Sequence, residues 1–461
     1  MAVPGYERLP ANEDQARPMS RAPTDRPPVV AFHIHEWKRS VLEAYFPEWD
    51  FHYMPFFVGD KEFVDVWQAR LAALENPSVI VWGPNLPQAG ADFCASRNIP
   101  VSFIEDGFLR SVGGSAGQSA PFSLTLDRQR PFFDSRAPSD LEDLLRTYDF
   151  DADPALIERA RAGIAVMLAH RIGKYGGQPA RGKVELPRGP GRKVLVVGQV
   201  ESDASIRYGA ERPILNNDLV RLAARENPGA TILYKPHPDV LNGVRKPSSD
   251  PAEVADLCHI LTAPMALPDV LDAIDHVYTI TSLAGFEALM RGKRVTVSGS
   301  PFYAGWGLTD DRQPNPRRGR SLSLEALFAG VYLLYPRYFD PRKGTQRCFE
   351  TTLAEMVEWQ RDGVPGDSRR LLSARKRPSP WRPFGAFGLL GWRHLLPLVV
   401  APLVARIGNA DDADAYRRDP IGFFREQSDT ALRRLGRWLY PFDDDRFANG
   451  FDRFRTGRND T

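Results

Sequence analysis

Two carboxylates follow shortly after the apolar run "VLVVG", which has the composition of a buried strand. Glu201 and Asp203 lie two residues apart in "GQVESDASI", so they share one face if the strand continues, or lie at a loop tip if the chain has turned. Carboxylates at the carboxyl end of a strand often serve as a nucleophile or a general base. We predict a catalytic role for both, and a solvated turn with a helix N-cap is the alternative.

A histidine held between two prolines follows the next apolar run, "TILY". In "KPHPDVL", His237 lies between Pro236 and Pro238, with Lys235 at the strand end. The prolines favour an extended backbone and remove amide donors. A fixed imidazole beside a lysine suits a phosphate, so we predict that Lys235, His237 and Pro238 contribute to a nucleotide site. A purely structural histidine is the alternative.

Two hydroxyls precede a helical segment of unusual composition, "SLAGFEALMRGKRV". Thr281 and Ser282 suit a helix N-terminus, where free amides and the helix dipole attract an anion. Gly285 costs roughly 1 kcal/mol of helix propensity relative to Ala, which a close approach of a backbone or a ligand would explain. Glu287 is suited to accept hydrogen bonds from a diol such as a ribose. The alternative is a capped core helix with one exposed glutamate.

A further acidic pair ends an apolar run in the first half of the chain. Glu105 and Asp106 precede Gly107 in "FIEDGFLRS". In an open parallel sheet, ligands bind beyond the carboxyl ends of the strands, so we predict that this pair faces the other motifs from an opposite wall. An ordinary acidic turn is the alternative.

Strand and helix patterns alternate along the chain, so the sequence predicts parallel sheets with helices on both faces. The pattern restarts after a Gly- and Pro-rich stretch, which indicates two lobes with a cleft between them. The predicted parts are a disordered leader at 1–28, a first lobe at 29–190, a second lobe at 191–362, and a linker with an apolar and amphipathic tail at 363–461.

The bulk composition limits the partners and the compartment. Sixty basic and 58 acidic residues leave a net charge of +2, which gives no general attraction to nucleic acid. The three cysteines have neither metal-ligand spacing nor a disulfide pattern, and the amino terminus lacks the apolar core of a secretory signal. We therefore expect a cytoplasmic protein.

An apolar stretch at 383–408 raises the question of membrane contact. Arg393, His394 and prolines interrupt it, which argues against a true span. Basic residues at 373–378 and 433–438 suit an anionic bilayer surface. Peripheral contact with the inner membrane is our prediction, and packing within the protein or against a partner is the alternative.

Four motifs together resemble the capsular polysaccharide biosynthesis and export family of bacterial β-Kdo glycosyltransferases. They are "FIEDGFLRSVG", "GQVESDASI", "YKPHPDVL" and "TSLAGFEALMRGKRVTVSGSPFYAGWGLTDDR". The resemblance covers about residues 29–350. It implies a GT-B-like fold of two Rossmann-type lobes, CMP-Kdo as donor, and transfer with retention to a Kdo-terminated glycolipid at the cytoplasmic face of the inner membrane.

The resemblance also implies roles for particular residues. Asp203 matches the carboxylate proposed to attack the sugar, and Glu105 or Asp106 matches the acid/base position. His237, Ser282 and Glu287 match the CMP-binding set. Retention requires two displacements, which two such groups would perform. No acidic pair is dedicated to a divalent ion, so we expect no metal cofactor.

The motifs occur once in this chain, whereas some family members carry two modules in tandem. We therefore expect one linkage, or action with other capsule biosynthesis and export proteins. A CMP-sialic acid-dependent transferase is an alternative with the same fold. A non-catalytic export or assembly component, which recognises the glycolipid and acts through the tail, is an alternative from a different class.

Overall fold

The structure is a computed structural model of the 461-residue chain. It describes residues 26–112, 119–175, 186–187, 189, 191–241, 248–263, 265–364, 393, 395–408 and 410–440. The disordered leader that we predict lies outside the described residues except for its last three positions. So does most of the linker that follows residue 364.

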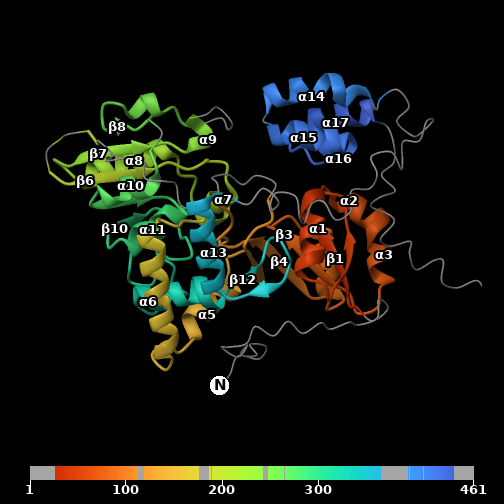
Figure 1. Ribbon diagram of the computed structural model, residues 1–461, viewed down its shortest axis with the longest axis horizontal. Coiled ribbons are helices and arrows are strands. Elements are labelled where there is room, and N and C mark those ends of the chain that lie inside the picture. Colours follow the sequence, from red (N-terminus) through yellow and green to blue (C-terminus); the bar gives the residue numbers. More distant parts are fainter. Residues whose placement is uncertain are drawn as a thin grey trace, which may run out of the picture.

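Seven strands of the described chain form the first sheet (Figure 1). Their order is β13 (Gln346–Arg347), β12 (Arg337–Phe339), β5 (Ser123–Asp127), β4 (Val101–Asp106), β3 (Ser78–Trp82), β1 (Pro28–Phe32) and β2 (Asp50–Tyr53). Strands β1 to β4 pair in parallel, whereas β5, β12 and β13 are antiparallel. The prediction of a parallel sheet is therefore wrong for β5. After β4 the chain folds back on itself, and the Gly107 amide donates to the Ser123 carbonyl at 2.9 Å.

Helices cover both faces of the parallel part of this sheet. They are α1 (Glu36–Tyr45) on one face, and α2 (Asp60–Glu62), η1 (Phe63–Trp67), α3 (Gln68–Ala72) and α4 (Gln88–Ser96) toward the other. Val41 and Leu42 of α1 pack with Ile80 and Ile104. Phe63 and Leu71 belong to the opposite core. This alternation of buried side chains is what two-sided burial of a strand requires.

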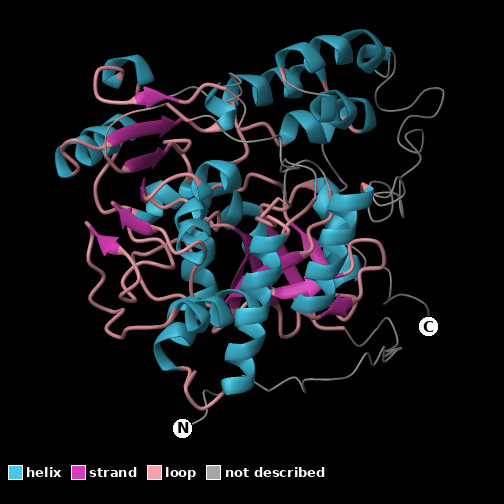
Figure 2. Ribbon diagram, turned by 60° about the vertical axis from the view of Figure 1, so that its left-hand side comes forward, coloured by secondary structure: helices cyan, strands magenta, loops and turns pink. Residues whose placement is uncertain are grey.

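The second sheet is parallel throughout its described strands. Its order is β11 (Asp310–Asp311), β10 (Arg294–Val297), β9 (His276–Thr279), β6 (Lys193–Val197), β7 (Thr231–Lys235) and β8 (His259–Ile260). The connecting helices are α7 (Ala204–Gly209), α8 (Asn216–Glu226), α9 (Pro238–Leu241), η2 (Pro251–Val254), α10 (Leu267–Asp272) and α11 (Leu283–Met290). Figure 2 shows helices around both sheets, as strand–helix alternation predicts.

The chain then returns from the second sheet to the first. Helices α12 (Leu324–Phe328) and η3 (Ala329–Leu334) pack against α6 (Pro154–Ala169), and β12 and β13 join the first sheet before α13 (Phe349–Asp362). The range that we predict for the second lobe thus contains two strands of the first sheet. A single core holds Phe108 of one part against Phe302 of the other, with ring centroids 4.9 Å apart.

A buried carboxylate ties the two sheets together. Glu142 of α5 (Asp140–Thr147) accepts from Arg317 Nε at 2.7 Å and from Arg318 Nε at 2.9 Å. Arg318 is itself buried and also donates to the carbonyls of Pro301 and Ala304. These bonds hold the loop behind β10 on the first half of the chain.

Four helices of the predicted tail form a small bundle: α14 (Leu396–Ile407), α15 (Ala410–Arg418), α16 (Pro420–Arg425) and α17 (Thr430–Leu439). Its core includes Ala401, Tyr416 and Phe424. Glu426 joins it to the first sheet's helices, because its carboxylate accepts from the Glu36 amide at 2.8 Å and lies 2.7 Å from His35 Nδ1. Among the described residues, no helix has both the length and the apolar character needed to cross a bilayer.

We predict that Glu142→Gln destabilises the protein by about 3–5 kcal/mol, because it leaves the buried Arg318 charge without a counter-charge. Chemical denaturation measures the change. The control is Asp143→Asn on the same helix, since the pair of Asp143 with Arg146 is exposed and should contribute no more than about 1 kcal/mol. Equal losses in the two variants would contradict the prediction.

Candidate functional site

The carboxyl ends of β6 and β9 meet through one glutamine. The Thr281 amide donates to Gln199 Oε1 at 2.8 Å, and Gln199 Nε2 donates to Thr281 Oγ1 at 3.1 Å. Thr281 Oγ1 also contacts Ser205 Oγ at 3.2 Å. These contacts follow from the pairing of β6 with β9, which places the two strand ends at the same edge. Polar side chains therefore gather at the edge where an open parallel sheet binds ligands.

Asp203 lies beside this group and caps a helix. Its carboxylate accepts from the Ser205 amide at 2.8 Å at the start of α7, and the residue is exposed. The N-cap alternative is thus confirmed for Asp203. The capping bond uses one carboxylate oxygen and leaves the other for further partners, so the catalytic role stays a prediction.

Glu201, in contrast, is engaged on both oxygens. It accepts from the amides of Asn216 at 2.8 Å, Ser248 at 2.7 Å and Ser249 at 3.0 Å, and also from the Ser249 hydroxyl. These donors hold the start of α8 and the loop before η2. A carboxylate with this many donors is suited to fixing loops, and the catalytic role of Glu201 stays a prediction.

Ser282 starts α11 as the sequence predicts. Its hydroxyl accepts from the Ala284 amide at 3.2 Å, and its own amide donates to Thr279 Oγ1 at 3.2 Å. The amino end of α11 therefore lies at the same edge as Gln199 and Thr281. A helix N-terminus at this place favours a negatively charged group.

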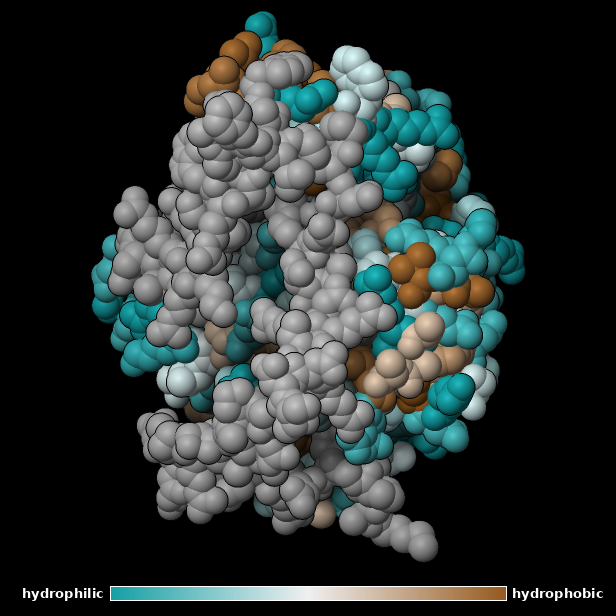
Figure 3. Space-filling model, turned by 90° about the vertical axis from the view of Figure 1, so that its right-hand side faces the viewer, coloured by the Kyte–Doolittle hydropathy of each residue, from teal (hydrophilic) through white to brown (hydrophobic). Residues whose placement is uncertain are grey.

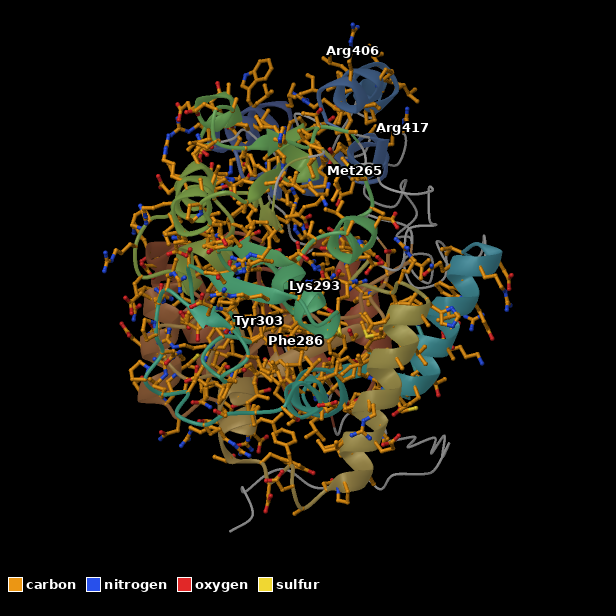
Figure 4. The ribbon with its side chains drawn as sticks, turned by 90° about the vertical axis from the view of Figure 1, so that its left-hand side faces the viewer. Met265, Phe286, Lys293, Tyr303, Arg406 and Arg417 are labelled. Carbon is orange, nitrogen blue, oxygen red and sulfur yellow. The ribbon has the colours of Figure 1, made fainter. Side chains whose placement is uncertain are left out.

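Gly285 makes room for a side chain of the protein. A Cβ at this position would lie 2.2 Å from Tyr303 Oη, and that hydroxyl donates to the Ser282 carbonyl at 2.6 Å. Figure 4 shows Tyr303 beside Phe286 of the same helix. The prediction that the glycine admits a ligand is replaced: Tyr303 takes that space and braces the first turn of α11.

Glu287 is buried, so the alternative of an exposed glutamate is wrong. It lies five residues beyond Ser282, about 7 Å along the helix. Its carboxylate lies against the backbone of Gly173, where a Cβ would approach Oε1 to 2.7 Å. Burial raises the pKa of Glu287 to about 7, against the opposing charge of Arg291. It therefore does not share the immediate surroundings of Thr281 and Ser282.

Lys235 is the last residue of β7, which pairs with β6, and His237 follows two residues later. The Gly198 amide donates to the Lys235 carbonyl at 2.9 Å. The end of β7 therefore lies next to the end of β6, which leads into Gln199. Burial lowers the pKa of the Lys235 ammonium. The His237 carbonyl accepts from the amides of Val240 and Leu241 and starts the short helix α9, in which Pro238 is the first residue.

A second cluster of charges lies at the end of β4 in the first sheet. Lys38 Nζ of α1 is 4.0 Å from Asp106 Oδ2, and Arg110 Nε is 3.3 Å from the same oxygen. Lys38 also lies over the Trp82 ring, 3.0 Å from its centroid. Asp106 Oδ1 is buried and has no hydrogen-bond partner in the described structure. A buried carboxylate oxygen without a partner is costly, and a catalytic role is one explanation for such a group in a native structure.

The environment separates the pKa values of the two acids. Burial raises the pKa of Glu105 to about 7, and the charge of Asp106 adds to the rise. Burial also acts on Asp106, but Lys38, Arg110 and Lys174 outweigh it and hold the pKa of Asp106 below its ordinary value. Burial lowers the pKa of Lys38 to about 8. One acid is thus ionised, and its neighbour exchanges a proton near neutral pH, a combination typical of acid/base sites.

A short segment behind α6 connects the two regions. Gly173 touches the Glu287 carboxylate, and the carbonyl of the next residue, Lys174, accepts from the Arg110 amide at 2.7 Å. The acidic pair of the first sheet and the far end of α11 therefore lie on either side of residues 173–174. Sequence reasoning missed Lys38 and Gln199, of which only Gln199 carried a signal, its place beside a strand end.

Two α/β sheets with polar groups at their strand ends define a class of α/β fold that binds ligands at the carboxyl edges of its strands. The family model for capsule polysaccharide biosynthesis proteins matches residues 77–180 and 156–338. The chain is 42% identical over 366 residues to the lipopolysaccharide-processing protein LpsZ of Rhizobium meliloti, covering 79% of this chain and 81% of LpsZ. The chain belongs to the capsule polysaccharide biosynthesis family.

Other relatives extend the comparison. LipA, a capsule polysaccharide modification protein of Neisseria meningitidis, is 37% identical over 311 residues, and the match spans 66% of this chain but 42% of LipA. Among solved structures, the β-Kdo 2,4 transferase of Thermosulfurimonas dismutans KpsC is 30% identical, with a TM-score of 0.59 over 72% of this chain and 98% of that one. The β-Kdo 2,7 transferase of the same KpsC is 32% identical, with a TM-score of 0.56 over 72% and 99%.

We predict that Gly285→Ala lowers the free energy of unfolding by about 1–3 kcal/mol through overpacking against Tyr303. The loss should be smaller in a Tyr303→Phe background, which removes the oxygen nearest the new methyl group. Urea denaturation of the four proteins measures the coupling. Gly319→Ala is the control, because a Cβ at that position would have no neighbouring atom within 4 Å. Equal losses in both backgrounds would assign Gly285 to a role other than packing.

A second prediction concerns pH. The folded-state pKa of Glu287, about 7, lies above its ordinary value of 4.5, so the stability that its neutral form provides is present below pH 4.5 and is lost as pH rises through 7. Glu287→Gln should therefore gain stability relative to the wild type as pH rises across this window. Melting temperatures across pH measure the difference. Glu158→Gln, at an exposed site, should show a flat difference, and a flat Glu287→Gln curve would refute the prediction.

Proposed function

We propose that the chain is a retaining β-Kdo glycosyltransferase that moves Kdo from CMP-Kdo to a Kdo-terminated glycolipid during assembly of the capsule linker. The observation that carries the proposal is the partly buried pair Glu105 and Asp106, whose pKa values are moved apart, in a chain that matches two β-Kdo transferase modules along 98% and 99% of their lengths. The GT-B arrangement, with donor and acceptor on different lobes, is part of this proposal.

Retention at a sugar carbon takes two displacements. In the first, an ionised carboxylate bonds to the anomeric carbon while the bond to the CMP phosphate breaks and CMP leaves with the electron pair. In the second, the acceptor hydroxyl displaces the carboxylate, and a base takes the hydroxyl proton. The enzyme must therefore supply one ionised carboxylate and one group that exchanges protons near neutral pH.

Asp106 is our preferred attacking carboxylate, and Glu105 the proton-exchanging group. Asp106 is held ionised by its cations and keeps one buried oxygen without a partner. Asp203, which resembles the attacking carboxylate of the family, is exposed and uses one of its oxygens to cap helix α7.

The edge of the second sheet supplies the donor site in this proposal. The amino end of α11, with Thr281 and Ser282, and the pair Lys235 and His237 would receive the phosphate of CMP, as helix ends and cationic groups do for anions. Glu287 would meet the ribose from farther along α11. No step in this scheme uses a metal ion, and independence from divalent metal is part of the proposal.

We predict that Asp106→Asn lowers transfer from CMP-Kdo to a β-Kdo glycolipid by about 10²–10⁴-fold or more, because it removes the attacking charge at little change in size. Asp203→Asn should retain most activity, since asparagine caps a helix as well as aspartate. Release of CMP and formation of product are both measured. The opposite ranking would move the chemical role to Asp203, and absence of CMP release with any acceptor would exclude the transferase.

The donor is tested in the same assay. Equal concentrations of CMP-Kdo and CMP-sialic acid compete for the enzyme, and product mass identifies the transferred sugar. A preference for CMP-sialic acid would assign the other donor. Binding of the glycolipid without turnover of either donor would favour a non-catalytic assembly component.

A further inference from the structure

Helix α14 turns an apolar face away from the rest of the protein. Leu398, Val399, Leu403 and Ile407 are exposed over 54–79% of their surfaces. They recur at the spacing of one helix face, while Ala401 of the same helix is fully buried in the bundle core. Figure 3 shows hydrophobic side chains at the upper end of the molecule, where Figure 1 places the bundle.

Helix α17 presents a second such face. Leu432, Leu435 and Trp438 are three residues apart and are exposed over 41%, 43% and 74% of their surfaces. Gly436 is buried instead and packs on Phe424. The apolar stripe of α17 therefore is not the face that holds the bundle together. Exposed tryptophan is typical of side chains that lie at a membrane–water interface.

Exposed arginines lie beside these faces, and the acidic Asp412 lies next to the end of α14. Arg406, Arg434 and Arg437 are exposed, and Figure 4 shows Arg406 pointing outward from the upper end of the molecule. Three acids of the bundle are used elsewhere: Asp419 and Asp429 cap helices α16 and α17, and Glu426 binds the start of α1. Arginines beside an apolar face complement an anionic lipid surface.

The bundle is also fixed to the part of the protein that carries the acidic pair. Glu426 holds the first turn of α1, and the Arg433 guanidinium lies over the Phe57 ring at 4.3 Å. Lys38, which contacts Asp106, lies in the same turn of α1. The outward faces of α14 and α17 thus have a defined orientation relative to that site.

We propose that the outward faces of α14 and α17 form a docking surface for an anionic lipid bilayer, with the leucines and Trp438 inserted among headgroups and the arginines on lipid phosphates. This inference rests on the proposed function only in that a glycolipid acceptor lies in a bilayer. It assigns the predicted peripheral contact to particular residues, and the Glu426 contact holds that surface next to the first sheet, which carries the acidic pair.

The test is flotation of the full-length protein with vesicles of phosphatidylglycerol and phosphatidylethanolamine, compared with phosphatidylcholine alone, at low and high salt. Wild-type protein should bind the anionic vesicles, and salt should weaken the binding. Arg434→Gln with Arg437→Gln should lower the partition coefficient by about five-fold for each arginine removed. Leu435→Ser with Trp438→Ser should reduce binding to the level of phosphatidylcholine.

The controls separate this surface from general effects. Val64→Ser with Val66→Ser removes exposed apolar side chains on η1, and Arg225→Gln removes an exposed arginine on α8; both should bind as the wild type does. Circular dichroism checks that each variant is folded. Unchanged binding of the α17 variants, or equal binding to both kinds of vesicle, overturns the proposal. The proposal is also overturned if the wild-type protein does not bind vesicles but forms a dimer that the α17 substitutions abolish.

Activity on a water-soluble acceptor distinguishes the two proposals. The α17 variants should transfer to it at the wild-type rate, because none of these residues contacts the acidic pair. Vesicle binding without any transfer would overturn the proposed function and leave the docking surface standing. Transfer to the soluble acceptor without vesicle binding would overturn the docking surface and leave the proposed function standing.

Discussion

The buried carboxylate of Glu142 is the contact on which the arrangement of the two sheets depends. It holds Arg318, which in turn donates to the carbonyls of Pro301 and Ala304. Between these two carbonyls lies Tyr303, which braces the first turn of α11 through the Ser282 carbonyl. The ion pair between Glu142 and Arg318 thus links the first half of the chain to the helix N-terminus that is proposed to bind the donor. Burial makes this dependence strict, since an uncompensated internal charge is far more costly than a lost surface pair.

The two charged regions use burial in different ways. At the end of β4, burial raises the pKa of Glu105, while Lys38, Arg110 and Lys174 keep Asp106 ionised. At the end of β6, Gln199 links strand ends by neutral hydrogen bonds and leaves the charge to the helix terminus and to Lys235. The proposed two-displacement sugar transfer would use the first region for proton exchange and attack, and the second for holding an anion.

The tail adds a third level of organisation. Its bundle has a core of its own, yet Glu426 ties it to the first turn of α1, from which Lys38 reaches Asp106. The same helix therefore touches both the bundle and the acidic pair. The apolar faces of α14 and α17 therefore belong to a bundle that is bonded to the same helix, α1, that contacts the acidic pair.

The sequence by itself determined the strand–helix alternation, the strand ends at which polar residues gather, the Ser282 cap and the acidic pair at Glu105. These follow from local periodicity and from helix-terminal chemistry, which neighbouring residues decide. Only the tertiary structure decided that β5 runs antiparallel, that β12 and β13 return to the first sheet, and that Tyr303 takes the space at Gly285. It also decided that Glu201 fixes loops, that Glu287 is buried against Gly173, and that Lys38 reaches Asp106. These outcomes depend on contacts between residues far apart in the chain, and burial, which sets the pKa values, exists only once those contacts form.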